Sequence, residues 1–121
     1  MNEVDRAQRA GMPNLRMIDP VGYMDFLKLT ASARIVLTDS GGIQEETTIL
    51  KVPCLTLRES TERPITAEIG SNRIVGTNPK NIIAAFFNEA MSGQARQTEI
   101  PPLWDGQAAK RIVKVLAEKL C

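Results

Sequence analysis

The chain has 121 residues, 43% of them hydrophobic, and carries 15 Lys and Arg against 14 Asp and Glu. This length and hydrophobic content suit a single globular domain with a buried core, and they exclude a disordered chain. The net charge of +1 gives no electrostatic reason to expect nucleic acid or a membrane surface as a partner.

The first third of the chain is predicted to contain a helix, a strand and a second helix. Residues 2–10 form a polar helical stretch that ends at a Gly and a Pro, so we interpret 1–13 as the remnant of an upstream helix. Residues 15–18 are predicted to form a strand, and a turn-rich loop over 19–23 connects it to a helix. The apolar side chains of that helix are Tyr23, Met24, Phe26, Leu27 and Leu29.

A strand-to-helix turn with two adjacent glycines follows. Residues 34–37 have the aliphatic composition of a strand buried on both faces, and 43–50 are predicted to be helical. Between them, Gly41 and Gly42 have no Cβ, so the backbone can turn tightly and another molecule can approach it closely. The unpaired amides at the start of the helix can bind an anion. The alternative is an ordinary turn with a Ser or Asp cap.

Glu46 is predicted to lie on the inward face of this helix. At 3.6 residues per turn it shares one side with Ile43, Thr47 and Leu50. A carboxylate in such a position needs partners. It can be stabilised by the helix dipole, by ~0.3–1 kcal/mol, or it can accept hydrogen bonds from ligand hydroxyls beside phosphates held by the turn. A phosphate next to a diol is the chemistry of a nucleotide.

The strand predicted over 52–57 leads into a charged, turn-rich segment at 58–64. In an open parallel sheet this segment and the glycine turn lie at the same edge, where ligands bind. Arg63 has a guanidinium suited to phosphate or sugar oxygens, and Arg58 is a less specific candidate. The alternative for Arg63 is a salt bridge within the loop, with Glu59 or Glu62.

The rest of the chain is predicted to complete an α/β domain. A short helix over 65–69 and a strand over 73–75 precede a helix capped by Asn78 and ended by Gly93. A terminal helix over 105–120, capped by Asp105, has lysines on its solvated side. The four predicted strands, at 15–18, 34–37, 52–57 and 73–75, give an open parallel sheet of about four strands with helices on both faces.

Several motifs together resemble the non-hydrolysing UDP-N-acetylglucosamine 2-epimerases. They are Asp39-Ser40-Gly41-Gly42-Ile43-Gln44-Glu45-Glu46, Val52-Pro53-Cys54-Leu55-Thr56-Leu57-Arg58, Thr61-Glu62-Arg63-Pro64 and Leu103-Trp104-Asp105-Gly106-Gln107-Ala108-Ala109. The resemblance covers roughly 14–119. It implies a GT-B architecture of two Rossmann-like domains, of which residues 1–121 resemble the distal part of the second, UDP-binding one.

The resemblance also implies an isomerase mechanism. The family interconverts UDP-N-acetylglucosamine and UDP-N-acetylmannosamine by removing the C2 proton, eliminating UDP and adding it back, without metal or cofactor. The implied UDP-binding residues are Ser40, Gly41, Gly42, Glu46, Arg63 and Phe26. Ser40, Gly41 and Gly42 are assigned to the diphosphate, Glu46 to the ribose, Arg63 to phosphate or sugar oxygens and Phe26 to uracil. Phe26 can instead be a core residue of an amphipathic helix.

No residue of this chain matches the family's proton-transfer residues. We therefore expect no catalytic residue here, an inactive isolated chain and weak UDP binding at most. The implied partners are a UDP-sugar, the N-terminal Rossmann-like domain and a second copy in a homodimer. The alternatives are a GT-B glycosyltransferase using a UDP-sugar, a non-catalytic nucleotide-binding or interaction module, and a hydrolysing epimerase.

The remaining composition argues against a metal site and for a cytoplasmic protein. The chain has no histidine, the commonest metal ligand and general base. Cys54 lies in an apolar strand and is predicted to be a small buried group, and Cys121 is the last residue. The sequence has no apolar run long enough to span a bilayer, and its first residues are too polar to begin a signal peptide.

Overall fold

The computed structural model describes residues 5–6, 11–92 and 98–121, and its centre is a parallel sheet. The strands are β1 (Val36–Thr38), β2 (Cys54–Thr56) and β3 (Asn72–Ile74), in the spatial order β1-β2-β3. Both neighbouring pairs are parallel, with Leu37 opposite Leu55 and Leu55 opposite Arg73. The predicted α/β class is confirmed.

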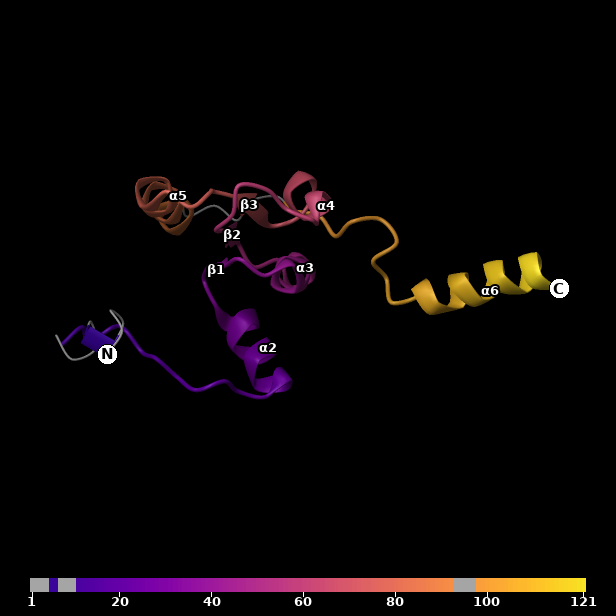
Figure 1. Cartoon of the computed structure of the whole chain (residues 1–121), viewed down its shortest axis with the longest axis horizontal. Helices are drawn as coiled ribbons and strands as arrows, with labels where there is room; N and C mark the ends of the chain where they lie inside the picture. The colour runs from indigo at the N-terminus through magenta and orange to yellow at the C-terminus, as the bar shows by residue number, and fades with distance from the viewer. Residues whose placement is uncertain (1–4, 7–10, 93–97) are drawn as a thin grey trace.

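Helices cover both faces of the sheet, as predicted. Helices α3 (Gly41–Leu50) and α4 (Pro64–Glu68) lie on one side, and α5 (Pro79–Met91) lies on the other (Figure 1). Each crossover between successive parallel strands carries one helix, which is the usual connection in parallel sheets. Helix α2 (Tyr23–Ser32) precedes β1 and contacts α3. Because both faces are covered, all three residues of β2 are buried.

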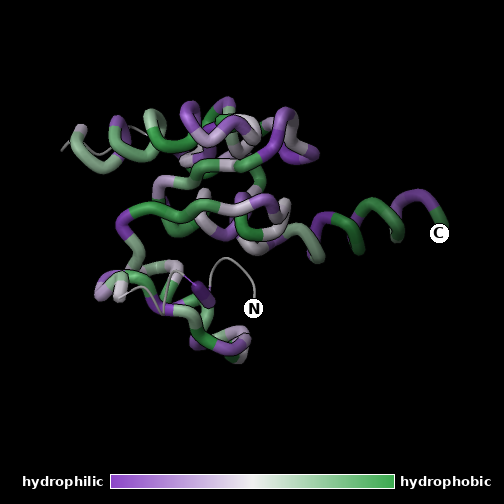
Figure 2. The backbone as a smooth tube through the Cα atoms, turned by 60° about the vertical axis from the view of Figure 1, so that its left-hand side comes forward, coloured by the Kyte–Doolittle hydropathy of each residue, from purple (hydrophilic) through white to green (hydrophobic). Residues whose placement is uncertain are grey.

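The core under α3 and α4 is largely polar. Leu55 and Cys54 are buried in the central strand, whereas α3 buries Gln44, Thr47 and Thr48. Each of these threonines bonds a helix carbonyl, Thr47 Oγ1 to Ile43 O at 2.8 Å and Thr48 Oγ1 to Gln44 O at 2.8 Å. Their methyl groups can therefore pack while their hydroxyls stay satisfied. The backbone hydropathy in Figure 2 shows the apolar strands at the centre of the domain.

One predicted strand does not form, so the sheet has three strands instead of about four. Residues 15–18 have no strand partner and are exposed to solvent. A strand requires a neighbour for its backbone groups, and within the described residues β1 pairs only with β2. In a doubly wound sheet of order 3-2-1-4-5-6, the third strand lies at the edge opposite to strands four to six. If β1, β2 and β3 are strands four to six, two further strands separate residues 15–18 from β1.

The predicted elements from Tyr23 onward are confirmed, with shifts at their ends. Asn78 caps α5 by accepting a hydrogen bond from the Lys80 amide at 2.9 Å. The terminal helix α6 is Ala108–Leu120 and its N-cap is Gln107, so the prediction that Asp105 caps it is wrong. Asp105 accepts from the Gln107 amide at 2.9 Å and therefore stabilises the turn before the helix.

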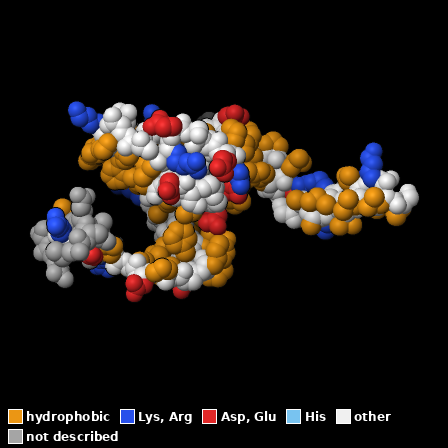
Figure 3. Space-filling view, viewed as in Figure 1, with side chains coloured by type: hydrophobic (Ala, Val, Ile, Leu, Met, Phe, Trp, Pro, Cys, Tyr) orange, Lys and Arg blue, Asp and Glu red, His pale blue; other side chains and the backbone are white. Residues whose placement is uncertain are grey.

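The ends of the chain contribute little to the core. Helix α6 extends away from the sheet and buries none of its residues (Figure 1). Hydrophobic side chains gather along it and over α2 (Figure 3). The helix predicted over 2–10 lies outside the described residues, except that Asp5 and Arg6 are helical. The predicted stop of α5 at Gly93 also lies outside them. Among the described helices, none combines the length and apolarity needed to cross a bilayer.

Candidate functional site

The glycine turn and the 58–64 segment lie at the same edge of the sheet, as predicted. The three strands are parallel, so their carboxyl ends meet at one edge. Immediately beyond this edge the Leu57 amide donates to Thr38 O at 2.8 Å, and the Gly76 amide donates to Arg58 O at 3.0 Å. These bonds join the three loops that follow β1, β2 and β3.

The start of α3 is open. Ser40 is the N-cap, is exposed, and makes no side-chain cap hydrogen bond, and its own amide donates to Thr38 Oγ1 at 3.0 Å. Gly41 and Gly42 are the first two residues of the helix, and neither has a positive φ. A Cβ built on either glycine meets no atom within 4 Å.

The two glycines are therefore not required by this fold. Neither the backbone conformation nor a neighbouring atom of the described chain demands the absence of a side chain. The expected tight turn is accordingly not the reason for glycine here. The geometry leaves room for another molecule to approach the helix amides closely.

Glu46 is half-buried, and its carboxylate has no hydrogen-bond or ion-pair partner in the described part of the chain. The expected orientation of α3 is shifted by about one residue, because the fully inward side chain is Gln44 and not Glu46. The shift arises because the buried face of α3 is polar, whereas the prediction placed the apolar residues Ile43 and Leu50 inward. Glu46 is two residues from Gln44, about 200° around the helix, so it points away from this face. Its acceptor oxygens have no partner in the described residues.

Arg63 lies beside the first turns of α3. Its Nε donates to Glu45 Oε1 in an ion pair, and its Nη1 donates to Glu62 O at 3.2 Å. Glu45 lies one helical turn beyond Gly41, which is a rise of about 5–6 Å. The alternative given for Arg63, a salt bridge with Glu59 or Glu62, does not form, because the ion pair is with Glu45.

The two loop carboxylates have other partners. Glu62 Oε1 lies 4.0 Å from Arg58 Nη1. Glu59 Oε1 accepts hydrogen bonds from the Thr77 amide and the Thr77 hydroxyl, both at 3.3 Å. Arg63 is exposed and its Nη2 bonds no protein group in the described residues, so the guanidinium retains donors for an anion.

Phe26 is not a core residue. It lies on α2 and its side chain is 39% exposed, while Thr30, one turn later, is buried. Helix α2 contacts α3, but no ring contact or hydrogen bond of the Phe26 side chain joins it to Ser40, Glu46 or Arg63. Its proposed uracil contact stays a prediction.

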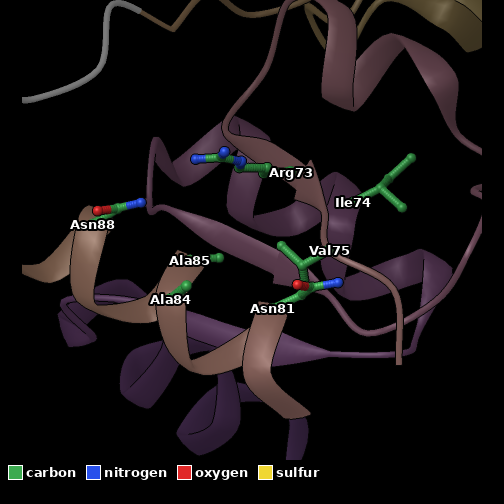
Figure 4. A pocket seen from close by; sticks show the side chains of 7 residues that line it. All are labelled: Arg73, Ile74, Val75, Asn81, Ala84, Ala85 and Asn88. Carbon is green, nitrogen blue, oxygen red and sulfur yellow. The ribbon is translucent and has the colours of Figure 1, made fainter. Parts of the chain in front are cut away.

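Two cavities lie near these elements. One of about 250 Å³ is lined by Glu45, Ile49 and Trp104, on the outer side of α3. Another of about 290 Å³ lies between the edge strand β3 and α5, where Arg73 and Asn88 extend toward each other (Figure 4). The second opens on the α5 side of the sheet, away from α3.

The roles of Gln44 and Glu45 were not predicted from the sequence. Gln44 Oε1 accepts from Thr61 Oγ1 at 2.6 Å and from Asn72 Nδ2 at 3.0 Å, so it joins α3 to the 58–64 segment. The available signal was the polar spacing of Gln44, Thr47 and Thr48, which places three hydrogen-bonding side chains on one helical face.

No metal chemistry is indicated in the part of the chain that the structure describes. Its His, Cys, Asp and Glu side chains form no group of three or more that could hold a metal ion. Cys54 is buried, as predicted, and burial raises the pKa of its thiol, although hydrogen bonds with Thr47 and Thr56 act in the opposite direction. This thiol is therefore structural.

The sequence matches a known enzyme family over nearly its whole length. The family model described as UDP-N-acetylglucosamine 2-epimerase matches residues 2–117. The chain is similar to the UDP-N-acetylglucosamine 2-epimerase of Methanocaldococcus jannaschii, with 48% identity over 102 residues, covering 84% of this chain and 27% of that protein. It is 40% identical to the Escherichia coli K12 enzyme of the same name, covering 85% of this chain and 28% of that protein.

Solved structures agree with the sequence match. The Methanocaldococcus jannaschii epimerase in complex with UDP-GlcNAc and UDP matches with a TM-score of 0.77 at 41% identity, covering 93% of this chain and 30% of that one. The S. aureus MnaA–UDP co-structure matches with a TM-score of 0.78 at 34% identity, covering 96% and 32%. The chain thus spans less than a third of the length of these relatives. Its structural neighbours have the GT-B architecture. It belongs to the UDP-N-acetylglucosamine 2-epimerase family.

Proposed function

We propose that this chain is the UDP-binding wall of a UDP-N-acetylglucosamine 2-epimerase. The complete enzyme interconverts UDP-N-acetylglucosamine and UDP-N-acetylmannosamine by eliminating UDP and adding it back. Negative charge develops on UDP as it leaves, so groups that bind the diphosphate stabilise the transition state. The relatives solved with UDP or UDP-GlcNAc support this choice of ligand.

The observation that carries the proposal is the open start of α3. A Cβ on Gly41 or Gly42 would meet no neighbouring atom, Arg63 with its unused donors pairs with Glu45 one turn along the helix, and Glu46 has unpartnered acceptor oxygens. Donors for a diphosphate therefore adjoin acceptors for ribose hydroxyls. In this arrangement Ser40 and the two glycines bind the diphosphate, Arg63 binds phosphate or sugar oxygens, Glu46 binds the ribose and Phe26 contacts uracil.

This chain is one side of a cleft, and it does not catalyse the reaction alone. The site residues lie on an open edge of the sheet, so a bound UDP would remain largely in water. Proton transfer at C2 requires groups from the rest of the enzyme. The N-terminal domain, a homodimer and a cytoplasmic location stay predictions from the sequence.

An NMR titration of the chain with UDP tests the proposal. We expect fast-exchange shifts of the Gly41, Gly42 and Glu46 amides, with a dissociation constant near the millimolar range. Uridine, which lacks the phosphates, should bind more weakly. Glu46→Ala should weaken UDP binding about tenfold, because a hydrogen bond to a charged group contributes roughly 1.5–3 kcal/mol in a closed site and less in this open one.

The control is Glu118→Ala, which removes the same charge from an exposed position on α6. This variant should bind UDP as the wild type does. The dissociation constant expected from an open site is roughly millimolar, so the titration extends to a UDP concentration about 10-fold higher. If the wild-type chain is folded and its amides at the start of α3 do not shift at that concentration, the isolated chain lacks the site. Adding the N-terminal domain in trans then tests whether the domain restores binding.

A further inference from the structure

A closed ring of hydrogen bonds surrounds the backbone of Arg63. The Arg63 amide donates to Thr61 Oγ1 at 2.9 Å, and Thr61 Oγ1 donates to Gln44 Oε1 at 2.6 Å. Asn72 Nδ2 donates to Gln44 Oε1 at 3.0 Å and to Thr66 Oγ1 at 3.0 Å. Thr66 Oγ1 donates to Arg63 O at 2.6 Å and closes the ring.

The threonine hydroxyls and the Asn72 amide of this ring each have matching partners. Each threonine hydroxyl donates once and accepts once, and the two protons of Asn72 Nδ2 have one acceptor each. Asn72 Oδ1 is also used, because it accepts from Thr56 Oγ1 on β2. Gln44, Thr66 and Asn72 are fully buried, so an unmade bond there would leave a buried polar group without a partner.

The ring connects the element that begins at the glycine turn to the loop that carries Arg63. Gln44 belongs to α3, Thr61 to the 58–64 segment, and Asn72 to β3. The next residue of α3, Glu45, holds the Arg63 side chain through Nε. Consecutive residues of one helix therefore hold the backbone and the side chain of the same arginine.

We propose that Thr61 and Gln44 are positioning residues that fix Arg63 relative to the amides of Gly41 and Gly42. This inference rests on the proposed function, since it assigns Arg63 to the UDP phosphates. The Thr61 hydroxyl gives its only proton to Gln44 and accepts from the Arg63 amide, so it has no proton to donate to a phosphate and acts on one through Arg63. A pre-positioned guanidinium loses less conformational freedom on binding than a mobile one.

Thr61→Val tests the ring, because valine has the shape of threonine but neither donates nor accepts. We expect the Arg63 amide to exchange with solvent about three- to tenfold faster and UDP to bind about three- to tenfold more weakly, the loss expected from one hydrogen bond. Thr61→Ser keeps the hydroxyl and should restore both properties to nearly wild-type values.

Two further variants separate positioning from general stability. Thr48→Val removes the hydroxyl of a fully buried threonine that lies outside the ring and bonds only Gln44 O within α3. It should lower stability without changing UDP affinity. In an Arg63→Ala background, Thr61→Val should cause no further loss of UDP affinity, because the guanidinium through which it acts is gone.

The outcomes distinguish this inference from the proposed function. Additive losses from Thr61→Val and Arg63→Ala, or an unchanged Arg63 amide in Thr61→Val, overturn the inference. A wild-type chain that binds no UDP with or without the N-terminal domain overturns the proposed function instead, and the Arg63 amide still decides whether the ring holds this residue. Circular dichroism confirms that each variant compared is folded.

Discussion

At the scale of single residues, adding a side chain at a glycine of α3 should change stability and UDP binding in opposite directions. Gly42 has an ordinary helical conformation, and the space for a Cβ is empty. Gly42→Ala should therefore keep or raise the free energy of unfolding, by up to ~1 kcal/mol, since alanine loses less backbone entropy in a helix. The same methyl group would stand where a phosphate must approach, so UDP affinity should fall at least about tenfold.

Urea unfolding and the NMR titration measure these two effects on the same variant. Gly70→Ala is the contrasting substitution, because its Cβ would lie 2.6 Å from Thr48 Cγ2 and 2.7 Å from Thr66 O. That variant should be strongly destabilised by overpacking, by roughly 1–3 kcal/mol or more. A Gly42→Ala chain that unfolds more easily and still binds UDP would show that glycine serves the fold.

The two thiols give a second prediction at this scale. Cys54 is buried with a raised thiol pKa, whereas Cys121 is exposed at the end of α6. A thiol-specific reagent should modify one cysteine of the native chain quickly and the second only on unfolding, because the thiolate is the reactive form. Cys121→Ser should abolish the fast phase. Fast modification of Cys54 in that variant would mean that the central strand opens readily.

Residues with a local role were predictable from the sequence, and residues with a distant partner were not. Asn78 caps the helix that begins at the next residue, Pro79, a relation visible in the local sequence. Gln44 bonds Thr61 and Asn72, 17 and 28 residues away, and Arg63 pairs with Glu45, 18 residues away. Local periodicity contains no information on such contacts, and it favours apolar side chains for the inward face.

At the scale of elements, the start of α6 is held by a local ion pair that acid should break. Arg111 donates from Nη1 and Nη2 to the two carboxylate oxygens of Asp105, both at 3.0 Å, and Nη2 also reaches Leu103 O at 2.8 Å. These bonds, and that from the Gln107 amide, lower the pKa of Asp105 to about 2. Leu103 has a positive φ of 71°, so the same bonds stabilise a turn that leucine disfavours.

The pH dependence follows from the lowered pKa. The folded carboxyl titrates at about 2 and the unfolded one near 3.8, so the stabilisation is complete above about pH 4 and is lost as the pH falls through about 2. Carboxyl NMR should give a midpoint of about 2 for Asp105, and a higher one in Arg111→Gln. Lys114→Gln, on the same helix, should leave the midpoint unchanged. An equal midpoint with and without Arg111 would contradict the assigned cause.

At the scale of the whole molecule, the sequence predicted the topology of the central unit and overestimated the number of strands. Three β–α units are recognisable from the local sequence, because each has an apolar strand with glycine or proline at its ends. Their parallel order follows from the handedness of the crossovers. Residues 15–18 have the composition of a strand, but strand formation depends on a neighbour that composition does not reveal. The missing strand is therefore a tertiary effect.

Stability should be distributed very unevenly over this molecule. All residues of β2 are buried between two paired neighbours, whereas α6 buries none of its 13 residues. An isolated helix shorter than ~12–15 residues is marginal in water, and the apolar stripe Ile112, Leu116 and Leu120 has nothing to cover it in the described chain. Native-state hydrogen exchange at low protein concentration should show the slowest amides around β2 and nearly unprotected amides in α6 and 15–18.

Repeating this measurement over a range of protein concentrations distinguishes an uncovered helix from a covered one. Protection of α6 that is strong at every concentration would contradict the prediction. Protection that rises with concentration would indicate that copies associate through the stripe, since burying leucine and isoleucine side chains contributes roughly 1.5–3 kcal/mol each. Leu116→Lys should then remove the concentration-dependent part and leave β2 unchanged, because α6 contributes nothing to the burial of the central strand.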